Sequence, residues 1–330
     1  MNKKVLIIGG AGFIGYYLTK HLAEKGGYDL TIADNFFRGK MDANLSQIVK
    51  THSIKVIKAD LTAAAEFDAF DKDYDQVYML ASVVGVDYTT SIPNEIIRIN
   101  TALIFNTLEW LKTTEVKRTL FTSTSECYAG AVEAFGYTIP TPEEVPLTIS
   151  DIKHPRFTYA VTKMLGESGF HNYSKVFGFE NVIVRYHNVY GPRMGFKHVI
   201  PHLAQRFIKG ETPFKVYGHD QTRAFCHIDD AVDGTVKAME VGGNGETYHI
   251  GTQDEITIGA LIHHAGDVMG YVGPYENAPT YPGSVSRRCP DITKARRELS
   301  YDPKVDWKTG VKETLEWYEK YIQSGQTVYE

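Results

Sequence analysis

Short uninterrupted apolar runs alternate with segments of helical periodicity along the first half of the chain. Each run has the length of a parallel strand that is buried on both faces of a sheet. These predicted strands are residues 4–8, 30–33, 54–57, 76–80, 118–121 and 181–185. Between them, apolar residues recur at helical spacing over residues 13–23 and 96–111. Strands that alternate with helices predict βαβ units, and hence a parallel sheet with helices on both faces.

The alternation weakens after about residue 190, where Gly and Pro cluster near residues 191–192, 210–218 and 270–290. Helical spacing persists in three later segments, residues 228–241, 257–269 and 307–322. A chain of 330 residues is long enough for about two domains. We therefore predict a doubly wound α/β domain over residues 1–190 and a smaller α/β lobe over residues 191–330. Some segments of the lobe are expected to return to the first domain.

Composition narrows the class of protein. Lys and Arg number 35 and Asp and Glu number 40, so the net charge of −5 argues against a nucleic-acid-binding protein. No segment reaches about 18 uncharged apolar residues, so we expect no membrane span. Cys127, Cys226 and Cys289 stand far apart without a CxxC motif, which favours a reducing, cytoplasmic compartment. No metal is expected, because the adjacent His263 and His264 would face different sides of a helix.

A glycine-rich turn follows the first predicted strand and opens the first predicted helix. Gly9, Gly12 and Gly15 have the spacing G-x-x-G-x-x-G, with Phe13 and Ile14 between the last two. Glycines at such a turn let the backbone approach a pyrophosphate, while the N–H groups of the helix N-terminus face the anion. Because the motif stands in the required strand–turn–helix context, it predicts a dinucleotide site.

Acidic residues follow the second and third predicted strands. Asp34, next to Asn35, ends the second strand, where a carboxylate accepts hydrogen bonds from ribose hydroxyls and repels a 2′-phosphate. This arrangement favours NAD over NADP, although Arg38 is near enough in the sequence to serve a 2′-phosphate. Asp60 follows the third strand, where it either contacts the adenine amino group or caps a helix.

A tyrosine and a lysine of the first domain form a candidate catalytic pair. Tyr159 and Lys163 are spaced i, i+4, so they share one face of a helix. The pKa of a phenol lies near 10, and a neighbouring ammonium and an oxidised nicotinamide would both lower it, which would make Tyr159 a base. Ser123, Thr124 and Ser125 follow the fifth predicted strand, where open α/β sheets bind ligands. A hydroxyl there would share the substrate proton.

In this order along the chain, the motifs resemble those of the extended short-chain dehydrogenase/reductases, specifically the nucleotide-sugar epimerase/dehydratase branch. The resemblance runs nearly from end to end. Further segments carry it, namely Asp60-Leu61, Leu80-Ala81-Ser82, Asn100 and residues 123–128, 185–193, 221–225, 229–230, 248–252 and 288–295. It implies a Rossmann-type fold, an NAD cofactor and a nucleotide-diphosphate sugar as substrate.

The resemblance also implies a role for each matching residue. Tyr159 would take the proton of the sugar C4 hydroxyl while hydride passes to NAD. Lys163 would lower its pKa and hold the nicotinamide ribose, and Thr124 matches the catalytic hydroxyl residue. The residues that match cofactor contacts are Gly9, Gly12, Phe13, Ile14, Gly15, Asp34, Asn35, Asp60, Leu61, Leu80, Ala81, Ser82 and Asn100. Those that match substrate contacts are Ser125, Asn188, Arg193, Arg223 and Arg288.

Two residues after the fifth strand bear on the net reaction. Simple 4-epimerases of this branch usually carry a small or hydroxyl residue where Glu126 stands, and dehydratases carry Asp where Ser125 stands. The string Ser-Thr-Ser-Glu is more similar to that of UDP-glucuronate decarboxylases, although those continue Val-Tyr-Gly and this chain continues with residues 127–129 as Cys-Tyr-Ala. We therefore take Glu126 as a fourth catalytic candidate. Three outcomes of C4 oxidation stay open: a 4-epimer, loss of CO2 to a pentose, and release of the 4-keto sugar.

Two further expectations concern class and assembly. A non-catalytic protein that senses the dinucleotide or serves as a scaffold is the alternative class, but such proteins usually lose the Tyr or the Lys. Members of the branch commonly form homodimers through a four-helix bundle. The helix over residues 95–111 and the helix with Tyr159 would supply it, although the apolar residues of both helices are equally compatible with burial in a monomer.

Overall fold

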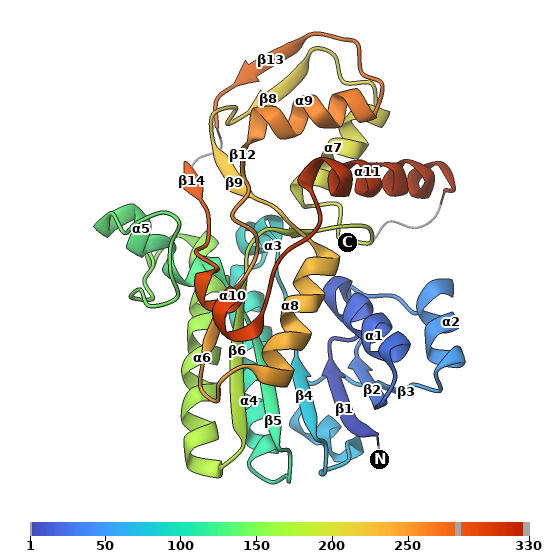
Figure 1. The fold of residues 1–330 in the computed structure, drawn as a ribbon, viewed down its shortest axis with the longest axis vertical. Coiled ribbons are helices and arrows are strands. Elements are labelled where there is room, and N and C mark those ends of the chain that lie inside the picture. Colours follow the sequence, from blue (N-terminus) through green and yellow to red (C-terminus); the bar gives the residue numbers. More distant parts are fainter. Residues whose placement is uncertain (1, 281–284, 326–330) are drawn as a thin grey trace.

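A parallel sheet forms the centre of the computed structural model, which describes residues 2–280 and 285–325 (Figure 1). Its strand order is β11-β6-β5-β4-β1-β2-β3, and all neighbouring strands pair in parallel. The bounds are β1 (Lys3–Ile8), β2 (Tyr28–Asp34), β3 (Lys55–Lys58), β4 (Gln76–Met79), β5 (Arg118–Thr124), β6 (Glu180–Tyr186) and β11 (Thr247–Ile250). The predicted doubly wound α/β fold is therefore confirmed.

Helices cover both faces of this sheet, because successive side chains of a strand point to opposite faces. In β1, Val5 and Ile7 belong to the apolar core shared with α1 and α8, whereas Leu6 and Ile8 belong to the core shared with α4 and α6. These helices are α1 (Phe13–Lys25), α8 (Ile228–Val241), α4 (Pro93–Leu111) and α6 (Thr158–Phe177). On the α1 and α8 face, α2 (Ala43–Thr51) packs on α1 and α10 (Thr293–Leu299) packs on α8.

A smaller lobe lies beyond the carboxyl ends of the central strands (Figure 1). Its helices are α7 (Val199–Ile208), α9 (Ile258–Val268) and α11 (Trp307–Gln323), and its strands are β8 (Phe214–Tyr217), β9 (Thr222–Ala224), β12 (Glu255–Thr257), β13 (Tyr275–Ala278) and β14 (Arg287–Arg288). Buried side chains such as Phe207, Phe214, Leu261 and Leu315 form a separate apolar core there. The short strands β7 (Val189–Tyr190) and β10 (Cys226–His227) pair where the chain passes between the two parts.

Five short helices complete the chain near the strand ends and connections. They are η1 (Ala64–Ala69), α3 (Val86–Ser91), η2 (Ser125–Tyr128), α5 (Ala129–Phe135) and η3 (Pro155–Phe157). Across the described ranges, 2–280 and 285–325, no helix combines the length and apolarity needed to cross a bilayer.

The periodicity of the sequence located the long elements well. Each of the six predicted strands and five predicted helices corresponds to an observed element, and their ends differ by at most three residues. β11 was not predicted, because its four residues carry too little pattern. Together with α8, it packs into the layers of the first domain although both follow residue 190. The boundary at residue 190 itself stays a prediction.

Candidate active site

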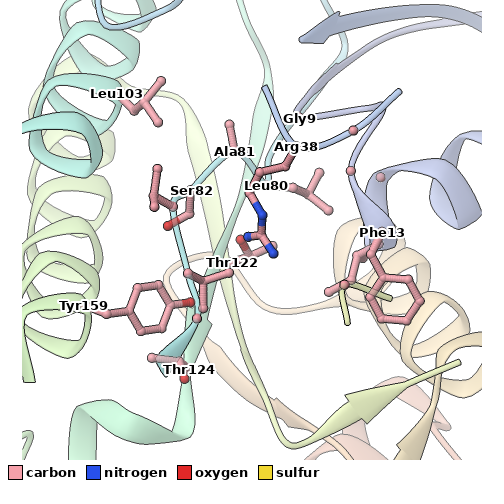
Figure 2. Close-up of a pocket in the computed structure, with 18 of the residues that line it drawn as sticks. Gly9, Phe13, Arg38, Leu80, Ala81, Ser82, Leu103, Thr122, Thr124 and Tyr159 are labelled. Carbon is pink, nitrogen blue, oxygen red and sulfur yellow. The ribbon is translucent and has the colours of Figure 1, made fainter. Parts of the chain in front are cut away.

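A cavity of about 520 Å³ lies at the carboxyl ends of β1, β2, β4 and β5 (Figure 2). Most of the predicted site residues line it. They are Gly9, Gly12, Phe13, Ile14, Gly15, Asp34, Asn35, Asp60, Leu61, Leu80, Ala81, Ser82, Thr124, Ser125, Glu126, Tyr159, Lys163, Asn188, Arg193 and Arg288. Two predicted residues, Asn100 and Arg223, do not line it.

The glycine turn after β1 is built so tightly that side chains are excluded. A Cβ at Gly15 would lie 2.1 Å from the carbonyl oxygen of Gly9. Gly9 itself has a φ of +88°, and a Cβ at this residue would lie 2.7 Å from Ala81 N. Gly12 caps α1, which begins at Phe13, so the first N–H groups of the helix face the cavity side of the turn. An anion at this place would meet these donors and the positive end of the helix dipole.

The two acidic residues of the cofactor end are held by the backbone. The carboxylate of Asp34 accepts hydrogen bonds from the N–H groups of Ala11 (3.0 Å) and Phe36 (2.8 Å). Burial raises its pKa, and these two donors partly offset that effect. Asp60 Oδ1 accepts from the N–H (3.1 Å) and hydroxyl (2.9 Å) of Thr62, so it closes a turn while also lining the cavity.

Asn100 lies behind the cavity wall. Its Oδ1 accepts from Val83 N (2.8 Å) and its Nδ2 donates to Val83 O (3.0 Å) and to Thr162 Oγ1 (3.3 Å). Val83 lines the cavity, and Thr162 directly precedes Lys163 in α6. Asn100 therefore connects the segment after β4 with the helix that carries the tyrosine–lysine pair.

Tyr159 and Lys163 lie on one face of α6, as their spacing predicted. The Lys163 ammonium donates to Thr122 O at 2.8 Å and lies 5.7 Å from the centre of the Tyr159 ring. Burial lowers the pKa of Lys163 to about 8. Burial also raises the pKa of Tyr159. The positive charge that acts against this rise is that of Arg38, whereas the sequence had predicted that Lys163 would lower this pKa. Without cofactor, the site therefore holds a neutral phenol.

Thr124 ends β5 and caps the short helix η2, with its Oγ1 accepting from Glu126 N at 3.3 Å. The strand behind it is fixed by a buried ion pair. Arg185 Nε and Nη2 donate to Glu167 Oε1 (2.9 Å) and Oε2 (2.7 Å), and Ser123 Oγ donates to the same carboxylate. Ser123 directly precedes Thr124, so this pair holds the position of the candidate hydroxyl.

Two arginines pair with Glu126, and the charge of a third, Arg223, also acts on it. Arg288 Nη1 hydrogen-bonds Glu126 Oε1, and Arg156 Nη2 lies 3.6 Å from Oε2. Burial opposes ionisation of this carboxyl, but Arg288, Arg156 and Arg223 outweigh it and hold the pKa of Glu126 below its ordinary value. Arg288 and Arg156 both line the cavity, so an anionic ligand bound there would meet their positive charge.

Asn188 and Arg223 shape the chain beside this cluster. Asn188 has a φ of +42°, a region that Asn tolerates better than most residues, and its Nδ2 donates to Ala224 O at 3.1 Å. Arg223 donates to Thr222 O (2.7 Å) and Val285 O (2.6 Å). Burial lowers its pKa to about 10, and Arg288 adds to that effect.

Arg193 is placed differently from the other predicted substrate contacts. Its guanidinium pairs with Asp42 Oδ2 at 2.6 Å and stacks 3.7 Å from the centre of the Tyr16 ring. Tyr16 belongs to α1 and Asp42 caps α2. These contacts are with helices of the cofactor side, although Arg193 also lines the cavity.

Sequence reasoning missed Arg156 and His198, which also line the cavity. Arg156 stands three residues before Tyr159, and η3 continues directly into α6, so the spacing i, i+3 could have placed both residues on one side. His198 lies between the glycine- and proline-rich segment and α7, where no periodic signal marked it.

Comparisons with known proteins show which family this chain resembles. The family model described as "NAD dependent epimerase/dehydratase family" matches residues 5–251. A UDP-N-acetyl-alpha-D-glucosaminuronate decarboxylase of Bacillus cytotoxicus is 33% identical over 96% of this chain and 98% of its own length. UDP-glucuronic acid decarboxylase 5 of Arabidopsis thaliana is 31% identical over 94% of this chain and 87% of its own length.

Solved structures give the same result. A UDP-glucose 4-epimerase of Thermotoga maritima, determined with UDP-glucose, has a TM-score of 0.84, 28% identity and coverage of 97% of this chain and 99% of its own. A UDP-glucuronic acid 4-epimerase variant of Bacillus cereus was determined with NAD and a fluorinated UDP-glucuronic acid. It has a TM-score of 0.81, 27% identity and coverage of 96% and 99%.

Proposed function

The chain belongs to the NAD-dependent epimerase/dehydratase family, and we propose that its net reaction is the decarboxylation of a UDP-linked uronic acid. It is an NAD-dependent enzyme of nucleotide sugars, and its first step is oxidation of the sugar C4 hydroxyl. Decarboxylases and 4-epimerases both occur among its relatives. The net reaction after C4 oxidation is the point that has to be argued from this chain's own residues.

The pairing of Arg288 and Arg156 with Glu126 at the cavity wall carries the proposal. A uronic acid differs from a neutral hexose by a carboxylate at C6, which requires positive charge beside the sugar. Arg156 and Arg288 line the same cavity as Tyr159, and both guanidinium groups pair with the single carboxylate of Glu126. Guanidinium groups bind carboxylates with two parallel hydrogen bonds, so this end of the cavity suits a uronate.

The residues present also fit NAD. The glycine turn has no space for side chains, so its backbone can approach a pyrophosphate closely. Asp34 presents a carboxylate to the cavity at the end of β2. We assign the same cofactor role to the other lining residues, Phe13, Ile14, Asn35, Asp60, Leu61, Leu80, Ala81 and Ser82. Bound NAD supplies a hydride acceptor at C4 and a donor when the hydride returns.

The chain's own residues account for the remaining steps. Tyr159 takes the proton of the C4 hydroxyl, Thr124 hydrogen-bonds the same oxygen, and Lys163 holds the nicotinamide ribose. The C4 ketone then stands β to the C6 carboxylate, so the C5–C6 bond breaks with release of CO2 and its electron pair moves toward the C4 oxygen. Tyr159 and Thr124, which hydrogen-bond that oxygen, stabilise the negative charge. A proton is added at C5, the hydride returns to C4, Tyr159 gives its proton back to the C4 oxygen, and the product is a UDP-pentose.

Dehydration and a purely dinucleotide-sensing role fit these residues less well than decarboxylation does. Dehydration needs an acid for the leaving C6 hydroxyl, and Ser125 stands in its place. A 4-epimerase of UDP-glucuronate would use the same arginines, so these residues do not separate it from a decarboxylase. The two reactions differ in whether the C6 carboxylate is lost as CO2. A protein that merely senses the dinucleotide would not need Thr124, Tyr159 and Lys163 arranged around one cavity.

The decisive experiment measures the mass of the product formed from UDP-glucuronate, UDP-N-acetylglucosaminuronate and UDP-glucose. We expect loss of CO2 from one of the uronates and no reaction of the neutral sugar. Arg288→Ala should abolish CO2 release, whereas Arg287→Ala, which removes the neighbouring exposed guanidinium paired with Glu255, should not. A uronate product of unchanged mass but inverted C4 would show a 4-epimerase instead.

Assembly and location complete the proposal. Ile97 and Phe105 of α4 and Leu165 of α6 are exposed at 48%, 48% and 39%. We propose that these helices pair with those of a second copy in a homodimer. The three buried cysteines are free thiols, which supports a reducing, cytoplasmic compartment.

A further inference from the structure

Arg38 lies in the loop between β2 and α2 and lines the cofactor cavity. Figure 2 shows its side chain extending into the cavity, with the guanidinium near Leu80 and Thr122 on the way to Tyr159. Its charge counteracts part of the rise that burial causes in the pKa of Tyr159, and it adds to the effect of burial that lowers the pKa of His198. The guanidinium therefore acts on the reactive end of the cavity.

Arg38 does not act on Asp34, four residues earlier. The pKa of Asp34 is set by burial and by the N–H groups of Phe36 and Ala11. A residue that reads the 2′-phosphate of NADP has to point at the adenosine ribose, which is where Asp34 stands. The charge of Arg38 therefore affects the pKa of Tyr159 and not that of Asp34.

The loop that carries Arg38 is pressed against the glycine turn. A Cβ at Gly39 would lie 2.2 Å from Ala11 O and 2.8 Å from Gly12 N, so only glycine fits there. Arg38 therefore leaves the backbone beside the N-terminus of α1, where N–H groups already favour an anion. From there its side chain extends into the cavity, toward the side on which Tyr159 lies (Figure 2).

The middle of a dinucleotide that reaches from Asp34 to Tyr159 is its pyrophosphate. Burial lowers the pKa of Arg38, which means that the cavity opposes its charge. A bound dianion would offset this cost, and the planar fork of arginine makes two hydrogen bonds to phosphate oxygens.

We propose that Arg38 binds the pyrophosphate of NAD and adds a cation to the N–H groups of the neighbouring glycine turn. It does not serve as a receptor for a 2′-phosphate. The inference rests on NAD binding and is independent of what happens to the sugar after C4 oxidation.

The test is a fluorescence titration of cofactor-free protein with NADH, followed by competition with ADP and with adenosine. Arg38→Ala should raise the Kd of NADH and of ADP about 10- to 100-fold, because a charged hydrogen-bonded contact is lost. The Kd of adenosine, which has no phosphate, should not change. Arg38→Lys should fall between wild type and Ala. Lys50→Ala, which removes an exposed cation from α2, should bind all three ligands as wild type does.

Three results would overturn the proposal. Unchanged Kd values for NADH and ADP would show that Arg38 does not contact the pyrophosphate. Equal weakening of adenosine and ADP would show a general distortion of the site, which the thermal melting point of the variant would also reveal. A loss confined to NADPH and 2′-AMP would assign Arg38 to the 2′-phosphate. A protein that binds NADH as expected but releases no CO2 would refute decarboxylation and leave this inference standing.

Discussion

Replacing Arg185 by Met should destabilise the fold far more than replacing both members of its ion pair. The side chains of Arg185 and Glu167 are only 6% and 4% exposed and make two hydrogen bonds of 2.9 and 2.7 Å. Without Arg185, the carboxylate of Glu167 keeps the Ser123 hydroxyl but loses its counter-charge inside the core. Breaking one partner of a buried pair costs about 3–5 kcal/mol, because a charge is left buried and uncompensated.

The double variant Arg185→Met/Glu167→Leu removes both charges and fills a similar volume. Ser123 and the Glu143 carbonyl still lose a partner, at about 1 kcal/mol each. We expect the double variant to recover at least about 1 kcal/mol relative to Arg185→Met alone. Guanidinium denaturation of cofactor-free protein at pH 7, completed with Glu167→Leu as a double-mutant cycle, measures this coupling. Additive losses would refute the reasoning, because they would mean that the two charges do not compensate each other.

Three further predictions follow from individual sites. The buried Lys163 has its pKa lowered from 10.5 to about 8, so its charge costs up to about 3 kcal/mol below pH 8 and less as the pH rises toward 10.5. In chemical denaturation, cofactor-free Lys163→Met should therefore be more stable than wild type at pH 7, and an advantage that does not shrink above pH 8 would contradict this. Gly15→Ala should abolish NADH binding and destabilise the protein by about 1–3 kcal/mol, because its Cβ would lie 2.1 Å from Gly9 O. NADH titration and thermal melting test it, and wild-type affinity would show that the turn can open. Ile97→Lys/Phe105→Lys should convert a dimer into a folded monomer by light scattering, whereas an unchanged mass would place the interface elsewhere.

Local patterns accounted for much of the fold and of the candidate site. The strand–turn–helix around Gly9 and Gly15 needs only a few consecutive residues, since the steric requirement is set by the turn itself. Tyr159 and Lys163 could be placed on one helix face because the helical repeat fixes their relation. The short elements could not be placed in this way. β11 has four residues, and nothing in them indicates that it pairs with β6, because that contact depends on the path of the whole chain.

The sequence by itself determined the parallel α/β architecture, the dinucleotide turn and the tyrosine–lysine pair, because each depends on residues close together in the chain. Only the tertiary structure decided which charges meet. Glu126 and Arg288 are 162 residues apart, yet they form the ion pair at the reactive end of the cavity. Arg38 stands four residues from Asp34, yet its side chain is directed toward Tyr159. The interaction between two charges depends on their distance in space and on how deeply they are buried. Neither quantity follows from their separation along the chain.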